Sequence, residues 1–173
     1  MNGSPLSSTP FSQSAPAQSG RKRRAISSCT SRVSIALQTP GRWHFAGQPV
    51  VYLAEHPASA LLEILVHQNL SHSERVPDSY QLLRVEVPAD IAVAELREAD
   101  TPENWRADPQ WTQSAGTEWL AGGATALLKV PSAILPATNF LLNPAHPDAA
   151  RLEIAEVIRV SHDRRILRLL SKD

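Results

Sequence analysis

Two apolar stretches, separated by a short break, dominate the first half of the chain. Residues 49–54 form a short apolar run, which predicts a buried strand. Residues 57–67 begin with proline and continue with Ala, Leu and Glu, a composition that favours a helix. This helix is apolar or small on nearly every face, so we expect it to be buried. Glu63 is the exception, and a buried carboxylate needs a partner or a function.

The remaining pattern predicts more strands than helices. Alternation or short apolar runs predict strands over 80–87, 126–130, 139–143 and the end of 151–160. Residues 111–120 fit a helix that ends at the Gly122–Gly123 pair. Residues 101–108 have the composition of a loop, 91–96 are ambiguous, and 164–170 fit a strand or a short helix. Short strands interrupted by a few helices predict an α+β fold with a compact mixed sheet.

The N-terminal segment differs in composition from the rest. Residues 1–38 are rich in Ser, Pro and Arg and contain little that could bury surface, so we expect disorder at least to Ser28. Residues 39–173 then form the domain. The basic run at 21–24 is interpreted as a solvated tail, with a nucleic-acid or targeting patch as the alternative.

Charge and cysteine content narrow the class of protein. From Glu55 onward the chain has 11 basic and 17 acidic residues, which is unlike a nucleic-acid-binding surface. Cys29 is the only cysteine, so one chain cannot form a disulfide framework or a cysteine-based metal site. There is no apolar run of about 20 residues that could span a membrane. We expect a soluble cytoplasmic protein.

Four polar residues stand in unusual places. Arg42 lies between glycines, where its guanidinium could bind a pyrophosphate; the alternative is a surface arginine or a salt bridge. Tyr52 interrupts an apolar strand, which is more typical of a core tyrosine than of a stacking platform. Glu63 is the strongest signal, with an ion pair or a contact to His67 as the structural alternative. Ser132 follows Pro131 and is by default a turn residue.

Familiar catalytic patterns do not fit. A triad could be written from Ser132, an acid and His67 or His146, but Ser132 lacks the Gly-x-Ser-x-Gly setting. Four residues could be proposed as metal ligands, although their spacings match no established motif: His67, His72, His146 and Asp148. We therefore expect no metal.

Several motifs taken together resemble the RES domain family, which is named for its Arg, Glu and Ser. They are Gly41-Arg42-Trp43, Val51-Tyr52-Leu53, Ala60-Leu61-Leu62-Glu63 with His67, Leu128-Lys129-Val130-Pro131-Ser132, Asn139, and Asn143-Pro144-x-His146-Pro147. The resemblance covers about residues 41–168 and is far more specific than any one motif.

The resemblance implies a function and a set of site residues. Members of this family are typically toxins of bacterial toxin–antitoxin pairs with a fold similar to ADP-ribosylating toxins, and they degrade NAD. The partner is usually a helix-turn-helix antitoxin of the Xre type, through which any DNA contact is indirect. Carried over to this chain, the catalytic residues are Arg42, Glu63 and Ser132, and the substrate-binding residues are Arg42, Tyr52, Ser132 and Asn139. NAD is the substrate, and no separate cofactor is expected.

Two other functions remain open at this stage. The same site could transfer ADP-ribose to a protein, whose identity the sequence does not give. Alternatively, the chain could be an inactive interaction module that binds an antitoxin or, through its basic tail, nucleic acid. Neither the oligomeric state nor the role of residues 1–40 in place of the family's first strand follows from the sequence.

Overall fold

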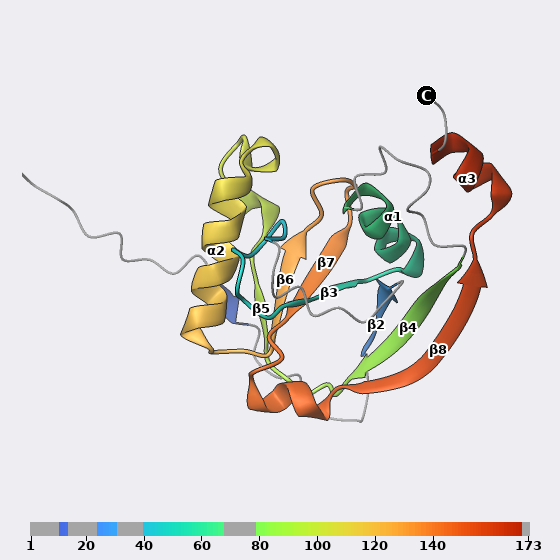
Figure 1. The fold of residues 1–173 in the computed structure, drawn as a ribbon. Helices are drawn as coiled ribbons and strands as arrows, with labels where there is room; N and C mark the ends of the chain where they lie inside the picture. Colours follow the sequence, from blue (N-terminus) through green and yellow to red (C-terminus); the bar gives the residue numbers. More distant parts are fainter. Residues whose placement is uncertain (1–10, 14–23, 31–39, 68–78, 171–173) are drawn as a thin grey trace, which may run out of the picture.

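The computed structural model describes residues 11–13, 24–30, 40–67 and 79–170. Within them, eight strands form one mixed sheet in the order β1-β5-β6-β7-β3-β2-β4-β8 (Figure 1). The strands are β1 (Ser12–Gln13), β2 (Arg24–Thr30), β3 (Val51–Ala54), β4 (Ser79–Val87), β5 (Val93–Glu95), β6 (Leu127–Pro131), β7 (Thr138–Leu142) and β8 (Glu153–Ser161). The fold is therefore α+β, as predicted.

One parallel strand pair explains where the second long helix lies. All neighbouring strands are antiparallel except β5 and β6, which are parallel. A parallel pair needs a crossover connection, and here it consists of η2 (Glu98–Asp100), η3 (Trp105–Ala107) and α2 (Pro109–Gly122). The Asp108 side chain caps α2 by accepting a hydrogen bond from the Trp111 N–H, and Gly123 ends the helix with a φ of 58°.

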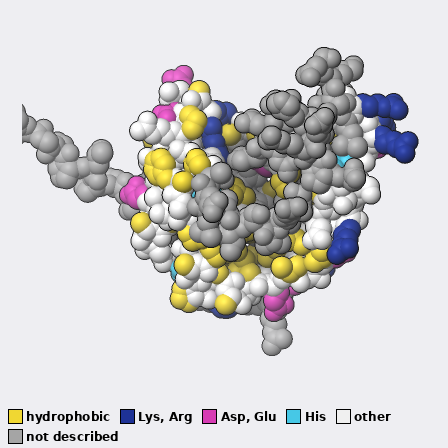
Figure 2. Space-filling view, in the orientation of Figure 1, with side chains coloured by type: hydrophobic (Ala, Val, Ile, Leu, Met, Phe, Trp, Pro, Cys, Tyr) yellow, Lys and Arg dark blue, Asp and Glu magenta, His cyan; other side chains and the backbone are white. Residues whose placement is uncertain are grey.

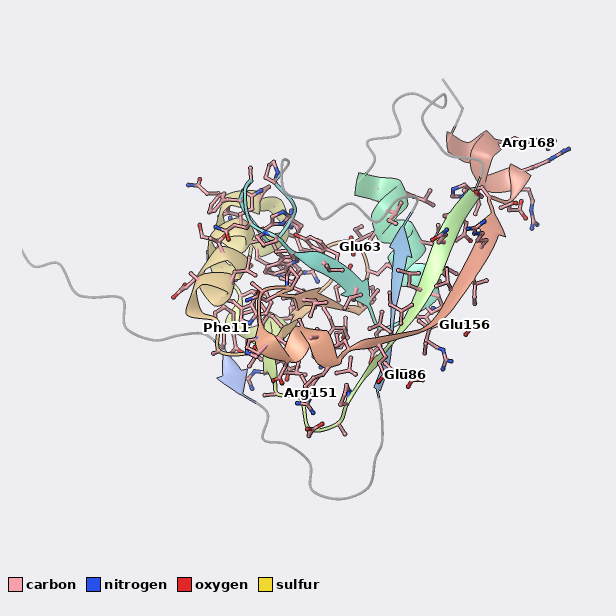
Figure 3. All side chains as sticks on the ribbon, turned by 60° about the horizontal axis from the view of Figure 1, so that its bottom comes forward. Phe11, Glu63, Glu86, Arg151, Glu156 and Arg168 are labelled. Atoms are coloured by element: carbon pink, nitrogen blue, oxygen red, sulfur yellow. The ribbon has the colours of Figure 1, made fainter. Side chains whose placement is uncertain are left out.

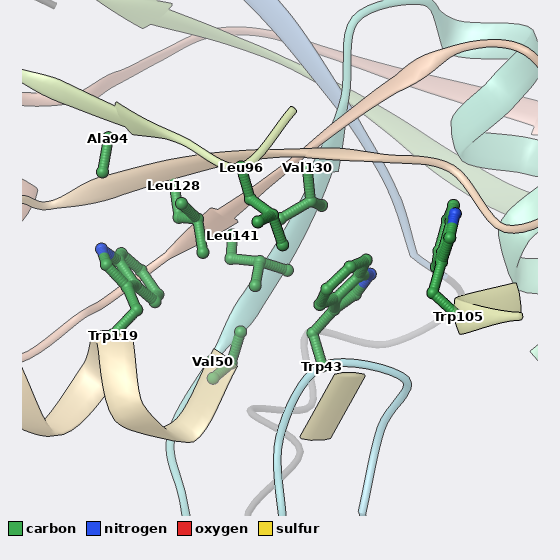
Figure 4. Close-up of a cluster of buried hydrophobic side chains, with 9 residues drawn as sticks. All are labelled: Trp43, Val50, Ala94, Leu96, Trp105, Trp119, Leu128, Val130 and Leu141. Atoms are coloured by element: carbon green, nitrogen blue, oxygen red, sulfur yellow. The ribbon is translucent and has the colours of Figure 1, made fainter. Parts of the chain in front are cut away.

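The largest apolar core lies between α2 and the sheet. Its buried side chains come from the turn before β3, from β5, β6 and β7, and from α2 and η3 (Figure 4). They are Trp43, Val50, Ala94, Leu96, Trp105, Trp119, Leu128, Val130 and Leu141. Trp119 donates its indole N–H to Thr125 Oγ1 over 3.0 Å, which satisfies the polar atom of a large buried ring. This core fixes the turn at residues 41–44 that carries Arg42.

The first helix, α1 (Pro57–His67), packs elsewhere, beside β2 and β3 (Figure 1). Only Ala60 among its described side chains is buried, and Val66 is exposed by 51%. The prediction of a buried helix was therefore wrong: the small cluster around Ala54 and Ala60 leaves most of the described side chains of α1 only partly buried or exposed. The predicted helical span of 57–67 is confirmed.

Other sequence predictions were confirmed or corrected element by element. The strands predicted at 80–87, 126–130 and 139–143 are β4, β6 and β7, and the ambiguous 91–96 contains β5. Residues 101–108 are not simply loop, since they contain the 3-10 turn η3. Residues 164–170 are the short helix α3 (Arg164–Leu170), and η4 (Pro147–Arg151) precedes β8.

The N-terminal prediction also needs correction. The structure places β1 and β2 within the segment expected to be disordered up to Ser28. Seven residues of β2 pair antiparallel with β4, which joins β4 and β8 to the rest of the sheet. The segments between these strands lie outside the described residues.

The far end of the sheet is more exposed and more charged than its centre. Eight of the nine residues of β8, the last strand of the sheet, are exposed. Basic side chains gather at the α3 end of the molecule (Figure 2), where Arg164, Arg165 and Arg168 lie. In the described part of the chain, no helix has the length and apolar character needed to cross a bilayer.

Candidate active site

The turn at residues 41–44 is held from several sides. The Gly41 N–H donates to the His44 carbonyl over 3.1 Å, and the Gly41 carbonyl accepts from Gln113 Nε2 of α2 over 2.9 Å. The Trp43 carbonyl lies so close to α2 that a Cβ on Gly116 would be 1.8 Å from its oxygen. The helix and the turn therefore meet through backbone, which explains the glycine.

Arg42 leaves this turn and is held by backbone carbonyls of η3. Its Nη2 atom donates to the Trp105 carbonyl over 2.9 Å and to the Arg106 carbonyl over 2.5 Å. The guanidinium also lies 5.8 Å from the centre of the Trp105 ring, and that ring is only 1% exposed. Burial lowers the pKa of Arg42, and the negative charges of Glu63 and Asp108 oppose this effect.

Tyr52 on β3 connects this turn to the sheet. Its hydroxyl oxygen accepts the Trp43 N–H over 3.0 Å and lies 2.8 Å from His44 Nδ1. Burial raises the pKa of Tyr52, the hydrogen bond from Trp43 opposes the rise, and the charge of Glu63 adds to it. The phenol is therefore neutral at physiological pH.

Glu63 points from α1 toward β3 (Figure 3), and a hairpin from the far end of the chain holds its carboxylate. Its Oε1 atom accepts two hydrogen bonds, from Ser132 Oγ over 2.8 Å and from Asn139 Nδ2 over 2.6 Å. Ser132 follows β6 and Asn139 lies on β7, so both donors belong to one antiparallel pair. The hydrogen bonds among described residues leave Glu63 Oε2 available.

The hydroxyl group of Ser132 uses its full hydrogen-bonding capacity in this arrangement. Its hydroxyl donates to Glu63 and accepts the backbone N–H groups of Ile134 over 3.1 Å and Leu135 over 3.3 Å. A hydroxyl has one hydrogen and two lone pairs, so all three positions are occupied. Ser132 therefore fixes the direction of the Glu63 carboxylate.

Two polar atoms of these residues lack a hydrogen-bond partner in the described part of the chain. Among the described residues, the buried side-chain atoms without a hydrogen bond are Arg42 Nε, Trp105 Nε1, Asn139 Oδ1 and His162 Nδ1. Buried polar groups are normally paired, so each exception needs an explanation. Arg42 Nε is a donor and Asn139 Oδ1 an acceptor, and neither atom is accessible from outside in this structure.

The family follows from comparison of the whole chain. The sequence model of the RES domain matches residues 8–166. The chain belongs to the RES domain family. The RES match includes β1 and β2, so the family's pattern extends into the segment that composition alone had set apart.

Named relatives of this RES domain include toxins. "Toxin Res" of Pseudomonas putida is 43% identical over 119 residues, which are 68% of this chain and 80% of that protein. The "Prs ADP-ribosylating toxin" of Sphingobium sp. is 40% identical over 135 residues, which are 75% of this chain and 82% of that protein. A similar fold occurs in the crystal structure of the M. tuberculosis MbcT–MbcA toxin–antitoxin complex, with a TM-score of 0.63, 17% identity and coverage of 87% of this chain and 90% of that one.

The structure brings the five predicted site residues of the RES domain together in two groups. Glu63, Ser132 and Asn139 are joined by hydrogen bonds. Arg42 and Tyr52 are linked through Trp43, the residue after Arg42, whose N–H donates to the Tyr52 hydroxyl. Besides the effect of burial, the negative charge of Glu63 acts to raise the pKa of both. Their roles in binding or catalysis stay predictions.

Sequence reasoning missed the residues that hold Tyr52, Arg42 and the turn that carries Arg42. They are His44, Trp105 and Gln113. A tryptophan in a stretch otherwise typical of a loop was the one signal that could have identified η3. Two of these residues are polar, and periodicity does not distinguish such side chains from surface ones.

The alternative metal and triad interpretations find no support in the described part of the RES domain. It contains no group of three or more His, Cys, Asp or Glu residues able to hold a metal ion. His146 accepts the Asp148 N–H and so caps η4. Ser132 is bonded to Glu63, and His72 lies outside the described residues.

Proposed function

We propose that this RES domain is the toxin of a toxin–antitoxin pair and that it cleaves the bond between nicotinamide and ribose in NAD. The observation that carries the proposal is the Glu63 carboxylate, fixed through one oxygen by Ser132 and Asn139 and available through the other. The names of the bacterial relatives support the toxin role.

The chemistry matches a fixed carboxylate. The nicotinamide of NAD leaves as a neutral molecule from a cationic pyridinium, so protonation by an acid is unnecessary. Positive charge develops on the ribose instead, as in glycoside hydrolysis, until a water molecule bonds to the ribose C1′ and loses a proton to solvent, which gives free ADP-ribose. A carboxylate held in place before the reaction stabilises this charge without reorganisation. Glu63 Oε2 takes this role, directly or through a ribose hydroxyl, while Oε1 stays bound to its two donors.

The other residues divide between substrate binding and positioning. Arg42 has its Nη2 atom engaged by carbonyls, and the positive charge of its guanidinium suits a phosphate or ribose oxygen. Tyr52 contributes a neutral ring that packs on the nicotinamide side. Asn139 holds Glu63 with its nitrogen and so acts on the substrate through that carboxylate. The saturated hydroxyl of Ser132 positions Glu63 instead of contacting NAD.

The proposed partner is an antitoxin. The structural neighbour with a TM-score of 0.63 was solved as a toxin–antitoxin complex, and a toxin of this kind requires neutralisation in its own cell. We propose a helix-turn-helix protein of the Xre type, with DNA contacted through the antitoxin alone. No separate cofactor enters the proposed reaction.

Incubation of the purified chain with NAD and measurement of free nicotinamide tests the function. The informative variant is Glu63→Gln, because the amide oxygen still accepts from Ser132 and Asn139 while the charge is lost. We expect turnover to fall by at least about 100-fold. Glu55→Gln is the matched control, since it removes an exposed carboxylate that precedes the same helix. Folded wild-type protein without turnover, or equal turnover in Glu63→Gln, would refute the proposal.

A second candidate activity is transfer of ADP-ribose to a protein. The name of the Sphingobium relative, an ADP-ribosylating toxin, favours it. NAD labelled in its adenine distinguishes the two reactions when it is added to a cell extract with the purified chain. Label on a protein band supports transfer, whereas free labelled ADP-ribose supports breakdown. An inactive interaction module would produce neither.

A further inference from the structure

The histidine that follows Trp43 has an unusual environment. His44 is fully buried, with 0% of its surface exposed. Its backbone carbonyl accepts the Gly41 N–H, and its ring lies tilted against the Tyr52 ring with 5.7 Å between centres. Burial of an imidazole is costly unless its nitrogens are hydrogen-bonded. A side chain used only to fill this space would be apolar, so the ring nitrogens call for an explanation.

The Tyr52 hydroxyl explains the presence of the imidazole. It lies 2.8 Å from His44 Nδ1 while accepting the Trp43 N–H over 3.0 Å. These two bonds come from consecutive residues of one turn and meet at one oxygen. The hydroxyl therefore has two fixed neighbours in different directions, which restricts its rotation and the position of the ring.

Gly41 shows that this meeting point is tightly built. A Cβ at Gly41 would lie 2.4 Å from His44 Cε1 and 2.5 Å from the Tyr52 oxygen. Any other residue would separate the imidazole from the phenol, because real Cβ contacts of this length do not occur. The turn, the histidine and the tyrosine thus form one unit, and Arg42 leaves the same turn.

We propose that His44 is a positioning residue that orients Tyr52 for the reaction, an inference that rests on the proposed function. The bond can run in either direction: Tyr52 donates to Nδ1, or Nδ1–H donates to the tyrosine oxygen. In both cases the imidazole fixes the hydroxyl, and because His44 is fully buried it does not itself touch NAD. His44 acts only through Tyr52.

Two substitutions separate positioning from packing. His44→Phe keeps an aromatic ring and removes the hydrogen bond. His44→Asn loses most of the ring but keeps a donor and an acceptor, one of which can stand near the position of Nδ1. If packing matters most, Phe is the better replacement; if the hydrogen bond matters most, Asn is. Circular dichroism and thermal melting establish that each variant is folded.

The first measurement needs no activity. The chain has two tyrosines, so a sample labelled with ¹³C at the tyrosine Cζ gives two signals, and Tyr52→Phe identifies that of Tyr52. We expect His44→Phe to move the Tyr52 signal and leave that of Tyr80 in place, and His44→Asn to leave both near their original positions. Should His44→Phe not fold, the imidazole nitrogens of His44 are observed in Tyr52→Phe, where loss of the hydroxyl must shift Nδ1. The proposal is overturned if the Tyr52 signal stays in place in His44→Phe, or if the His44 Nδ1 signal stays in place in Tyr52→Phe.

The second measurement is NAD turnover in a double-mutant cycle. We expect His44→Phe and Tyr52→Phe each to lower kcat by roughly tenfold, the value of one hydrogen bond, with KM changed little. The double variant should be no slower than either single one, because both remove the same contact. His44→Asn should retain most of kcat. Losses that multiply to roughly 100-fold, or a better rescue by Phe than by Asn, overturn the proposal.

The two proposals fail in different ways. A wild-type chain that leaves NAD intact refutes the function while the tyrosine signal still decides whether His44 holds Tyr52. If wild type cleaves NAD but the losses of His44→Phe and Tyr52→Phe multiply in the double variant, the role of His44 is refuted and the proposed function stands.

Discussion

The candidate site has two sides that are held in different ways. On the arginine side, which comprises residues 41–44 with η3 and Gln113, backbone atoms make most of the contacts to Arg42 and its turn. On the carboxylate side, which comprises Glu63, Ser132 and Asn139, side chains hold another side chain. The arginine side borders the main core, whereas Glu63 lies on a helix that is only partly covered.

This difference separates stability from activity. Changes on the arginine side disturb backbone contacts and the packing of α2, so they should reduce stability together with function. Changes on the carboxylate side remove hydrogen bonds between Glu63 and the buried side chains of Ser132 and Asn139. They leave the main core and the backbone contacts of the turn in place, so the fold should tolerate them while catalysis suffers. The predictions below test this division, beginning with the largest expected effect.

Gly116→Ala should be the most damaging substitution on the arginine side. Its Cβ would lie 1.8 Å from the Trp43 carbonyl oxygen and 2.9 Å from the carbonyl carbon, and neither backbone atom can rotate away. We expect a loss of about 3 kcal/mol in the free energy of unfolding, measured by urea denaturation.

Gly122→Ala is the matched control in the same helix. No atom lies within 4 Å of the position that a Cβ would take at Gly122, so alanine should be neutral or stabilise the helix by up to about 1 kcal/mol. Equal stability of the two variants would mean that the contact between α2 and the turn does not hold the arginine side together.

Among the variants that keep Glu63, loss of both donors should have the largest effect on the carboxylate side. The double variant Ser132→Ala/Asn139→Ala leaves Glu63 Oε1 without its two hydrogen bonds. We expect NAD turnover to fall by about 100-fold, and each single variant by about tenfold, because one donor still orients the carboxylate. Thermal melting is the control, and unfolding of the double variant at room temperature would contradict the division between the two sides.

Tyr52, which lies between the two sides, should give a smaller, pH-dependent effect. Its pKa is raised by burial, so above about pH 10 the unfolded chain loses a proton that the folded chain keeps. Stability contributed by the neutral phenol is complete below that pH and declines above it. Between pH 10 and 11 the free energy of unfolding should fall more steeply in wild type than in Tyr52→Phe, by at most about 1.4 kcal/mol per pH unit. The measurement is urea denaturation of the two proteins at several pH values. If the free energy of unfolding changes by the same amount in both proteins between pH 10 and 11, the prediction is refuted.

Local signals in the sequence predicted much of the fold. The apolar run before Pro57, the alternation in β4 and the glycine pair after α2 each depend on neighbours in the chain, and all three were interpreted correctly. The exposure of α1 was misjudged because apolar composition shows what a helix can bury, not what the rest of the chain provides to cover it. The strand β2 was missed because a segment with several serines and basic residues has no apolar period, and its pairing with β4 depends on distant residues.

The candidate site was predictable only in part. Arg42, Glu63 and Ser132 came from an ordered set of motifs, and their spacing alone left each of them ambiguous. The hydrogen bond between Ser132 and Glu63 joins residues that are 69 positions apart in the sequence. A contact over that separation cannot be predicted from the local sequence pattern. The same holds for the carbonyls of η3, since every residue carries one and only the fold determines which of them meet Arg42.

The hairpin of β6 and β7 has a consequence for how the site is assembled. Ser132 and Asn139 are separated by only six intervening residues, and the pairing of Val130 with Asn139 and the bond from the Ser132 N–H to the Ala137 carbonyl already bring them together. Glu63 is 69 and 76 positions away from them. Docking of α1 on this hairpin therefore closes one long loop and forms two hydrogen bonds. The conformational entropy lost is that of bringing two parts of the chain together, α1 and the hairpin, and not three separate residues.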